Sequence, residues 1–160
     1  MSKIKLNAVR TTKDMIFDIV FLVLTLAIWG IILWLISRAP DIVPTHFGPS
    51  GKPDAYGPPT FILIPSAIIT VVALVCAFSI YLPFSSVNLP FYNGPGNERQ
   101  KKLAMLLSRI VALFLLGLML FIAIYSLALK DHESITPILV IIGLMFAVSL
   151  VFTILMYRAK

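Results

Sequence analysis

The apolar positions of this chain gather into four long segments that are separated by more polar stretches. The segments cover residues 15–37, 61–84, 110–129 and 137–157, and charged residues are rare inside them. A helix needs about 20 mostly apolar residues to cross the hydrocarbon core of a bilayer. The pattern therefore predicts an all-α integral membrane protein, a four-transmembrane-helix bundle in a single domain over residues 1–160.

Local signals predict where some of these helices begin. Residues 94–96 (Gly-Pro-Gly) break a helix, so we expect the third helix to begin just after them, near Glu98. Thr136 followed by Pro137 is typical of a helix start, which predicts the beginning of the fourth. Pro65 lies one turn into the second segment, where it should kink that helix or delay its start.

Small residues recur at a spacing that suits contact between membrane helices. Such pairs let two helices approach closely, and they favour a packed bundle. Three pairs stand three or four positions apart: Ala73 and Ala77, Gly143 and Ala147, and Ala27 and Gly30.

Composition and charge placement add an orientation. Hydrophobic residues make up 59% of the chain and charged residues 12%, against about half and a quarter in soluble domains. Ten of the thirteen Lys and Arg residues lie before the first segment, between the second and third, or after the fourth; the exceptions are Arg38, Lys52 and Lys130. The positive-inside rule then predicts cytoplasmic N- and C-termini. The net charge of +6 reflects this topology and contact with the lipid bilayer, and no nucleic-acid binding is expected.

The connection between the first two segments is rich in proline. Six of the eleven prolines fall within residues 40–59, which excludes a helix there. The segment also holds Ile42, Val43, Phe47 and Tyr56, which give it apolar groups to pack with. We therefore predict an ordered, extracytoplasmic, Pro-rich loop that caps the bundle between helices 1 and 2.

This loop supplies the candidate binding residues. Aromatic side chains offer rigid contact area, and a histidine and a carboxylate offer directional polar contacts. Alternatively, the aromatic rings pack onto the helix ends or sit at the level of the lipid headgroups. The predicted partner-binding residues are Pro44, His46, Phe47, Gly51, Asp54 and Tyr56.

His46 is also a weak candidate metal ligand. Together with His132 and neighbouring carboxylates it could bind a zinc-like ion. However, no spacing in the chain matches a known metal or catalytic motif. We therefore predict no cofactor and no enzymatic activity, and we favour a role for His46 as a hydrogen-bonding post in the loop.

Two charged residues lie inside the apolar segments or at their ends. Asp18 is one turn into the first segment and Arg109 enters the third at a similar depth, which predicts an intramembrane Asp18–Arg109 pair. The pair could be a gate or a proton-coupled site. The simpler interpretation, which we favour, is a structural ion pair or two side chains that extend to the interface.

The loop carries a family resemblance. Residues 40–47 (Pro-Asp-Ile-Val-Pro-Thr-His-Phe) and 51–57 (Gly-Lys-Pro-Asp-Ala-Tyr-Gly) resemble the signature of a bacterial membrane domain of unknown function. That domain is best known from the immunity proteins against the sporulation-delaying toxin, the SdpI family. The resemblance covers about residues 15–125. It implies a bacterial inner (cytoplasmic) membrane protein that acts in immunity or signalling.

The function that we expect is recognition of a toxin, peptide or protein partner through the outer loop, without catalysis. A second possibility is an accessory or structural subunit of a larger membrane complex. An outer-face metal-dependent site and a small transporter built around Asp18 are further alternatives. The sequence leaves the oligomeric state open.

Overall fold

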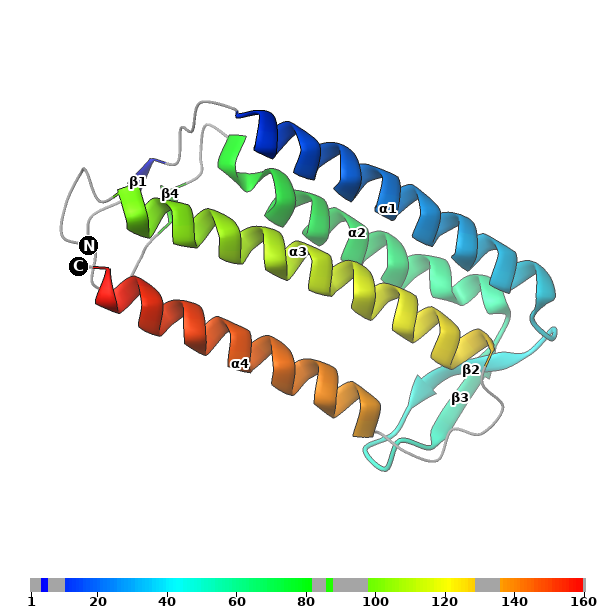
Figure 1. Ribbon diagram of the computed structural model, residues 1–160. Coiled ribbons are helices and arrows are strands. Elements are labelled where there is room, and N and C mark those ends of the chain that lie inside the picture. Colours follow the sequence, from blue (N-terminus) through cyan, green and yellow to red (C-terminus); the bar gives the residue numbers. More distant parts are fainter. Residues whose placement is uncertain (1–3, 6–10, 82–85, 88–97, 129–135, 160) are drawn as a thin grey trace.

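Four helices that run side by side dominate the structure, a computed structural model (Figure 1). Each is long and apolar enough to cross a membrane, and for the second helix this length includes the turn that precedes it. Four such helices fit a multi-pass membrane protein. The described residues are 4–5, 11–81, 86–87, 98–128 and 136–159. The helices are α1 (Thr12–Arg38), α2 (Leu63–Phe78), α3 (Glu98–Leu127) and α4 (Thr136–Arg158).

Helix α1 begins three residues earlier than predicted because of a capping box. Thr11 accepts a hydrogen bond from the backbone N–H of Asp14 at 3.3 Å, and the Asp14 carboxylate accepts one from the Thr11 backbone N–H at 2.8 Å. These contacts satisfy donors that the first helical turn leaves open. At the other end, Ala39 is extended and Pro40 follows, which cannot continue a helix.

Helix α2 is framed by two short 3₁₀ turns, η1 (Pro59–Ile62) and η2 (Ser79–Tyr81). Pro65 is the third residue of α2, where a backbone N–H has no intrahelical partner in any case. The proline therefore fits the first turn, and the α-helix starts two residues after the predicted position. The predicted end of this span, residue 84, lies outside the described residues.

The other helix boundaries lie close to their predicted positions. Helix α3 begins at Glu98, as predicted, and so extends well before the apolar segment that starts at residue 110. It ends at Leu127, two residues short of the expected end. Helix α4 includes the whole predicted span from residue 137 to residue 157.

Helices α1, α2 and α3 enclose the core, and α4 packs against α3 at the edge of the bundle (Figure 1). Ala73 and Ala77 of α2 and Ala112 and Ala123 of α3 are all fully buried in the core, and small residues of this kind let the backbones of the two helices approach closely. The buried residues of α1 recur every three or four positions and form one stripe along the helix: Asp14, Asp18, Phe21, Thr25, Ile28 and Ile32.

Helix α4 is the least buried of the four. A hydrogen bond from the Gln100 side-chain amide to the Met156 carbonyl, 2.9 Å long, fixes its last turns to the start of α3. Gly143 and Ala147 are exposed along its length, so this predicted small-residue pair makes no buried contact in the described part of the chain. The pair Ala27 and Gly30 on α1 is exposed as well.

The proline-rich segment contains a β-hairpin, which corrects the prediction of an all-α fold. Strand β2 (Val43–Phe47) pairs antiparallel with β3 (Pro53–Gly57), with an irregular register around His46. Both strands are edge strands, so Pro44 and Pro53 interrupt no central ladder of hydrogen bonds. The hairpin lies at the end of the bundle opposite the two termini (Figure 1).

A second, smaller pairing lies near the termini. Strand β1 (Ile4–Lys5) pairs antiparallel with β4 (Ser86–Val87), which joins the N-terminal arm to the chain that follows α2. The sequence predicted neither of these two-residue strands.

Candidate functional site

The β2–β3 hairpin is held on the bundle by its apolar side chains. Val43 is 4% exposed and belongs to the same buried cluster as the helices. The Phe47 ring lies 5.0 Å from the Tyr125 ring of α3, measured between centroids, and Tyr125 in turn stacks on Phe121. These contacts fix one face of the hairpin against α3. Phe47, a predicted binding residue, therefore acts in packing.

The turn of the hairpin is fixed by glycine. Gly51 has a φ of 81°, a left-handed conformation that residues with a side chain rarely adopt. Its N–H donates to the Gly48 carbonyl, and the Gly48 N–H donates to the Lys52 carbonyl, both at 2.9 Å. Gly51 thus shapes the turn with its backbone, and this is the role that the structure gives to this predicted binding residue.

Three predicted binding residues project from the hairpin into the surroundings. The Nδ1 atom of His46 lies 2.5 Å from a carboxylate oxygen of Asp54, and the two side chains are 70% and 52% exposed. Tyr56 is 61% exposed. Pro44 is half-buried and lines the space beneath the hairpin. The structure therefore brings an imidazole, a carboxylate and a phenol onto one small element.

The described residues offer little to a metal ion. Within them, no group of three or more His, Cys, Asp or Glu side chains lies close enough to hold one. His46 has Asp54 beside it, which makes two potential ligands where zinc sites use at least three from the protein. The other histidine considered from the sequence, His132, lies outside the described residues.

Two clefts lie between the hairpin and the helix ends. The larger, about 690 Å³, is bordered by the ends of α1 and α3 and by both strands. The smaller, about 360 Å³, lies between β2, η1 and α3. Ligand sites in proteins commonly have volumes of 300–1,000 Å³.

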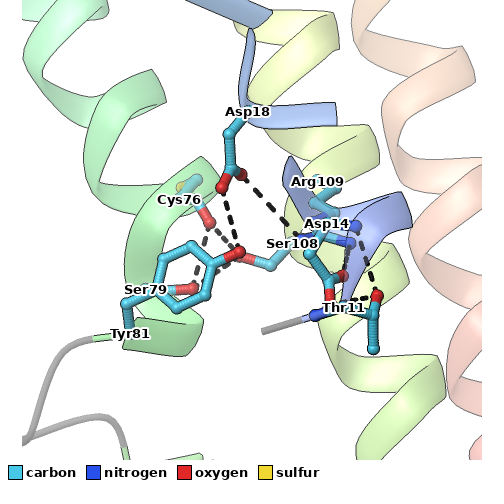
Figure 2. Close-up of polar contacts among 8 residues, drawn as sticks. All are labelled: Thr11, Asp14, Asp18, Cys76, Ser79, Tyr81, Ser108 and Arg109. Carbon is cyan, nitrogen blue, oxygen red and sulfur yellow. Dashed lines mark hydrogen bonds and ion pairs between the residues drawn. The ribbon is translucent and has the colours of Figure 1, made fainter. Parts of the chain in front are cut away.

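A second cluster of polar residues lies toward the other end of the bundle, where α1, η2 and α3 meet (Figure 2). Nη1 of Arg109 donates to a carboxylate oxygen of Asp14 at 2.7 Å, while its Nη2 lies 4.0 Å from Asp18. All three side chains are at most 14% exposed. The predicted Asp18–Arg109 contact is thus the longer of two, and Asp14 is the closer partner of the guanidinium.

Further contacts fix this cluster. The Tyr81 hydroxyl donates to Asp18 at 3.0 Å, and the Arg109 guanidinium lies 4.6 Å from the centre of the Phe17 ring. Tyr81 follows the end of the second span. The pKa of its phenol is raised, mainly because the group is buried and secondly because it donates to Asp18. The hydroxyl therefore keeps its proton at neutral pH and continues to donate to the carboxylate.

Two serines bind the same backbone carbonyl. Ser79 and Ser108 donate to the carbonyl of Cys76 at 3.0 and 2.6 Å, and their hydroxyl oxygens lie 3.1 Å apart (Figure 2). Ser108 precedes Arg109 on α3, so this contact fixes the position of α3 relative to the end of α2. The cluster as a whole fastens three helices together.

Sequence reasoning missed Asp14 and Tyr81. Asp14 is one residue outside the predicted span and reads as a solvated residue at a helix start. One signal could have identified it, because Asp14 lies four positions before Asp18 and hence on the same face of a helix. Tyr81 carries no such signal, since its contact depends on how the chain leaves α2.

A family model described as a domain of unknown function (DUF1648) matches residues 23–70. The match includes most of α1, the whole hairpin, η1 and the first turns of α2, and so it contains every predicted loop residue. The comparison with curated proteins found no match, and neither did the comparison with solved structures.

Proposed function

We propose that this chain is a non-enzymatic membrane protein of the immunity or signalling type. In this proposal the hairpin recognises a toxin, peptide or protein partner outside the cell, and the protein resides in a bacterial inner membrane. The resemblance of the loop to the SdpI family supports the type of function.

The observation that carries the proposal is the exposure of polar and aromatic groups on a firmly anchored element. His46, Asp54 and Tyr56 are all more than half exposed, while Val43 and Phe47 hold the hairpin against the helices. Because the hairpin is already held in place, it loses little conformational freedom when a partner binds, which favours recognition. Aromatic residues are also enriched among those that dominate binding energy.

The placement of charge supports the proposed orientation. In the sequence, ten of the thirteen Lys and Arg residues belong to the N-terminal arm, to the stretch between the second and third apolar segments or to the C-terminal tail. Cytoplasmic loops carry such an excess. The hairpin then lies on the outer side, where an external toxin or peptide would meet it.

A photo-crosslinking amino acid in place of Tyr56 tests this function in native membranes. We expect one discrete adduct, which is lost when His46→Ala and Asp54→Ala are added. A matched probe at Phe146, which is 73% exposed on α4, should not give that adduct. Equal labelling from both positions, or an adduct that still forms when His46 and Asp54 are substituted, would contradict the recognition role.

A second candidate is an accessory subunit of a larger membrane complex. The observation that favours it is the exposure of α4, which packs mainly against α3 and presents Gly143 and Ala147 outward. Small residues on an open helix face allow another membrane helix to approach closely. The same crosslinking experiment separates the candidates, since a subunit partner should label from α4 and not from the hairpin.

A further inference from the structure

The larger cleft under the hairpin has an apolar wall that is continuous with the outer surface of α1. Trp34 and Leu35 contribute from α1, Ile42 and Val43 from the start of β2 and the residue before it, and Leu127 from the end of α3. Trp34 and Ile42 are 59% and 67% exposed, so the cleft opens toward the surface that α1 presents to its surroundings. An apolar molecule in the bilayer can reach the cleft from that side.

Three polar side chains border this apolar space: Arg38, Tyr56 and Ser126. Within the described part of the chain, none of the three makes a hydrogen bond or an ion pair. Ser126 is only 7% exposed, but its hydroxyl oxygen is not among the fully buried polar atoms that lack a partner, so a ligand in the cleft can reach it. Each of these groups can donate a hydrogen bond, so together they suit a ligand that accepts several.

The charge of the cleft selects the sign of the ligand. Arg38 is cationic, and the described lining residues include no carboxylate. The planar guanidinium group binds phosphate through paired hydrogen bonds better than an ammonium group does. Arg38 is also the last residue of α1 and lies one turn beyond Trp34. Tryptophan and basic residues at the end of a membrane helix typically lie at the level of the lipid headgroups.

We propose that this cleft is a binding site for an anionic phospholipid. The phosphate lies against Arg38 and accepts hydrogen bonds from Tyr56 and Ser126, and an acyl chain covers Trp34, Leu35 and Ile42. The site shares Tyr56 with the proposed recognition surface, but its phosphate contact at Arg38 does not require that the hairpin bind a partner. A peptide carboxylate shares the anion chemistry, but the open apolar approach from α1 favours a molecule that is already dissolved in the bilayer.

The test uses the full chain in phosphatidylcholine nanodiscs with increasing phosphatidylglycerol, and native mass spectrometry counts the lipid that stays bound. We expect one retained phosphatidylglycerol, with an affinity that falls at least tenfold in Arg38→Gln and about threefold in Tyr56→Phe. The matched control is Lys52→Gln, which removes an exposed cation from the turn of the hairpin. Its affinity should equal that of the unsubstituted chain.

Four results would overturn the proposal. Equal losses in Arg38→Gln and Lys52→Gln would mean general attraction of basic residues to anionic lipid. Displacement by glycerol phosphate would indicate a site for a soluble phosphate. Displacement by an apolar peptide with a free C-terminal carboxylate, but not by its amide, would assign the cleft to a peptide. Unchanged retention in Tyr56→Phe, an exposed substitution that should not affect folding, would remove the phenol from the site.

Discussion

Each end of the helical bundle contains polar side chains joined by a short contact, and the two sets differ in their access to solvent. At one end Arg109 and Asp14 are 14% and 10% exposed, and Asp18 beside them is 2% exposed. At the other end His46 and Asp54 are 70% and 52% exposed. Buried charges must find partners, because removing one leaves the other uncompensated, whereas exposed pairs contribute little to stability. The comparison therefore assigns fastening to the first cluster and leaves the second available to a partner.

The contacts around Arg109 favour the structural interpretation of the buried cluster. The guanidinium contacts Asp14 and Asp18, and Tyr81 donates to Asp18 (Figure 2). The guanidinium also lies against the ring of Phe17. Each of these groups is thus directed at a neighbour within the cluster.

The largest expected effect is at the buried end. Arg109→Gln leaves Asp14 and Asp18 without their shared cation, and we expect the free energy of unfolding to fall by about 3 kcal/mol. The measurement is unfolding by SDS in mixed micelles. Adding Asp14→Asn to Arg109→Gln should recover part of the loss, because it removes the uncompensated negative charge.

The matched control for this substitution is Arg99→Gln, on the same helix but exposed. It should leave the unfolding free energy almost unchanged. If Arg109→Gln proved as stable as Arg99→Gln, the cluster would not fasten the helices, and a functional role for Asp18 would become the better interpretation.

A smaller effect is expected where the hairpin meets α3. Phe47→Ala removes the ring that packs on Tyr125, and because Phe47 is only half-buried we expect a loss of about 2 kcal/mol, below the usual range for a core phenylalanine. Tyr56→Ala on the neighbouring strand should cost much less, since that ring is largely exposed. Equal losses for the two substitutions would mean that the hairpin is not anchored through Phe47.

The smallest effect is expected at the exposed pair. A double-mutant cycle with His46→Ala and Asp54→Ala should give a coupling of about 0.5 kcal/mol or less, because both side chains are more than half exposed. Partner binding should fall much more than stability does. A coupling as large as that around Arg109 would show that the exposed pair fastens the hairpin as the buried cluster fastens the helices.

The four helices could be predicted because a membrane span requires a long apolar segment. The hairpin could not, because its strands are short, each contains a proline, and the register is irregular around His46. Neither strand shows the alternation of apolar and polar residues that identifies a half-buried strand. The pairing is fixed by the turn at Gly51 and by contact with α3, which only the folded chain brings together.

The buried cluster around Arg109 was predicted only in part, because some of its contacts also form only in the folded chain. The sequence identified Asp18 and Arg109 because charges are rare within spans. It missed the closer partner, Asp14, because the predicted span began at residue 15, one position after Asp14, and the Arg109 contact joins positions 95 residues apart. In the hairpin, composition suggested six binding residues. It could not separate Phe47 and Gly51, which shape the hairpin, and Pro44, which is half-buried, from the exposed His46, Asp54 and Tyr56.

The measurement that tests the account most directly is the sidedness of the hairpin. In a Cys76→Ser background, Lys52→Cys and Arg158→Cys are treated with a membrane-impermeant maleimide in intact bacterial cells. Four spans place the hairpin opposite the C-terminus, so position 52 should react at once and position 158 only after permeabilisation. Labelling of both positions, or of position 158 alone, would contradict the outward-facing hairpin and the recognition role that depends on it.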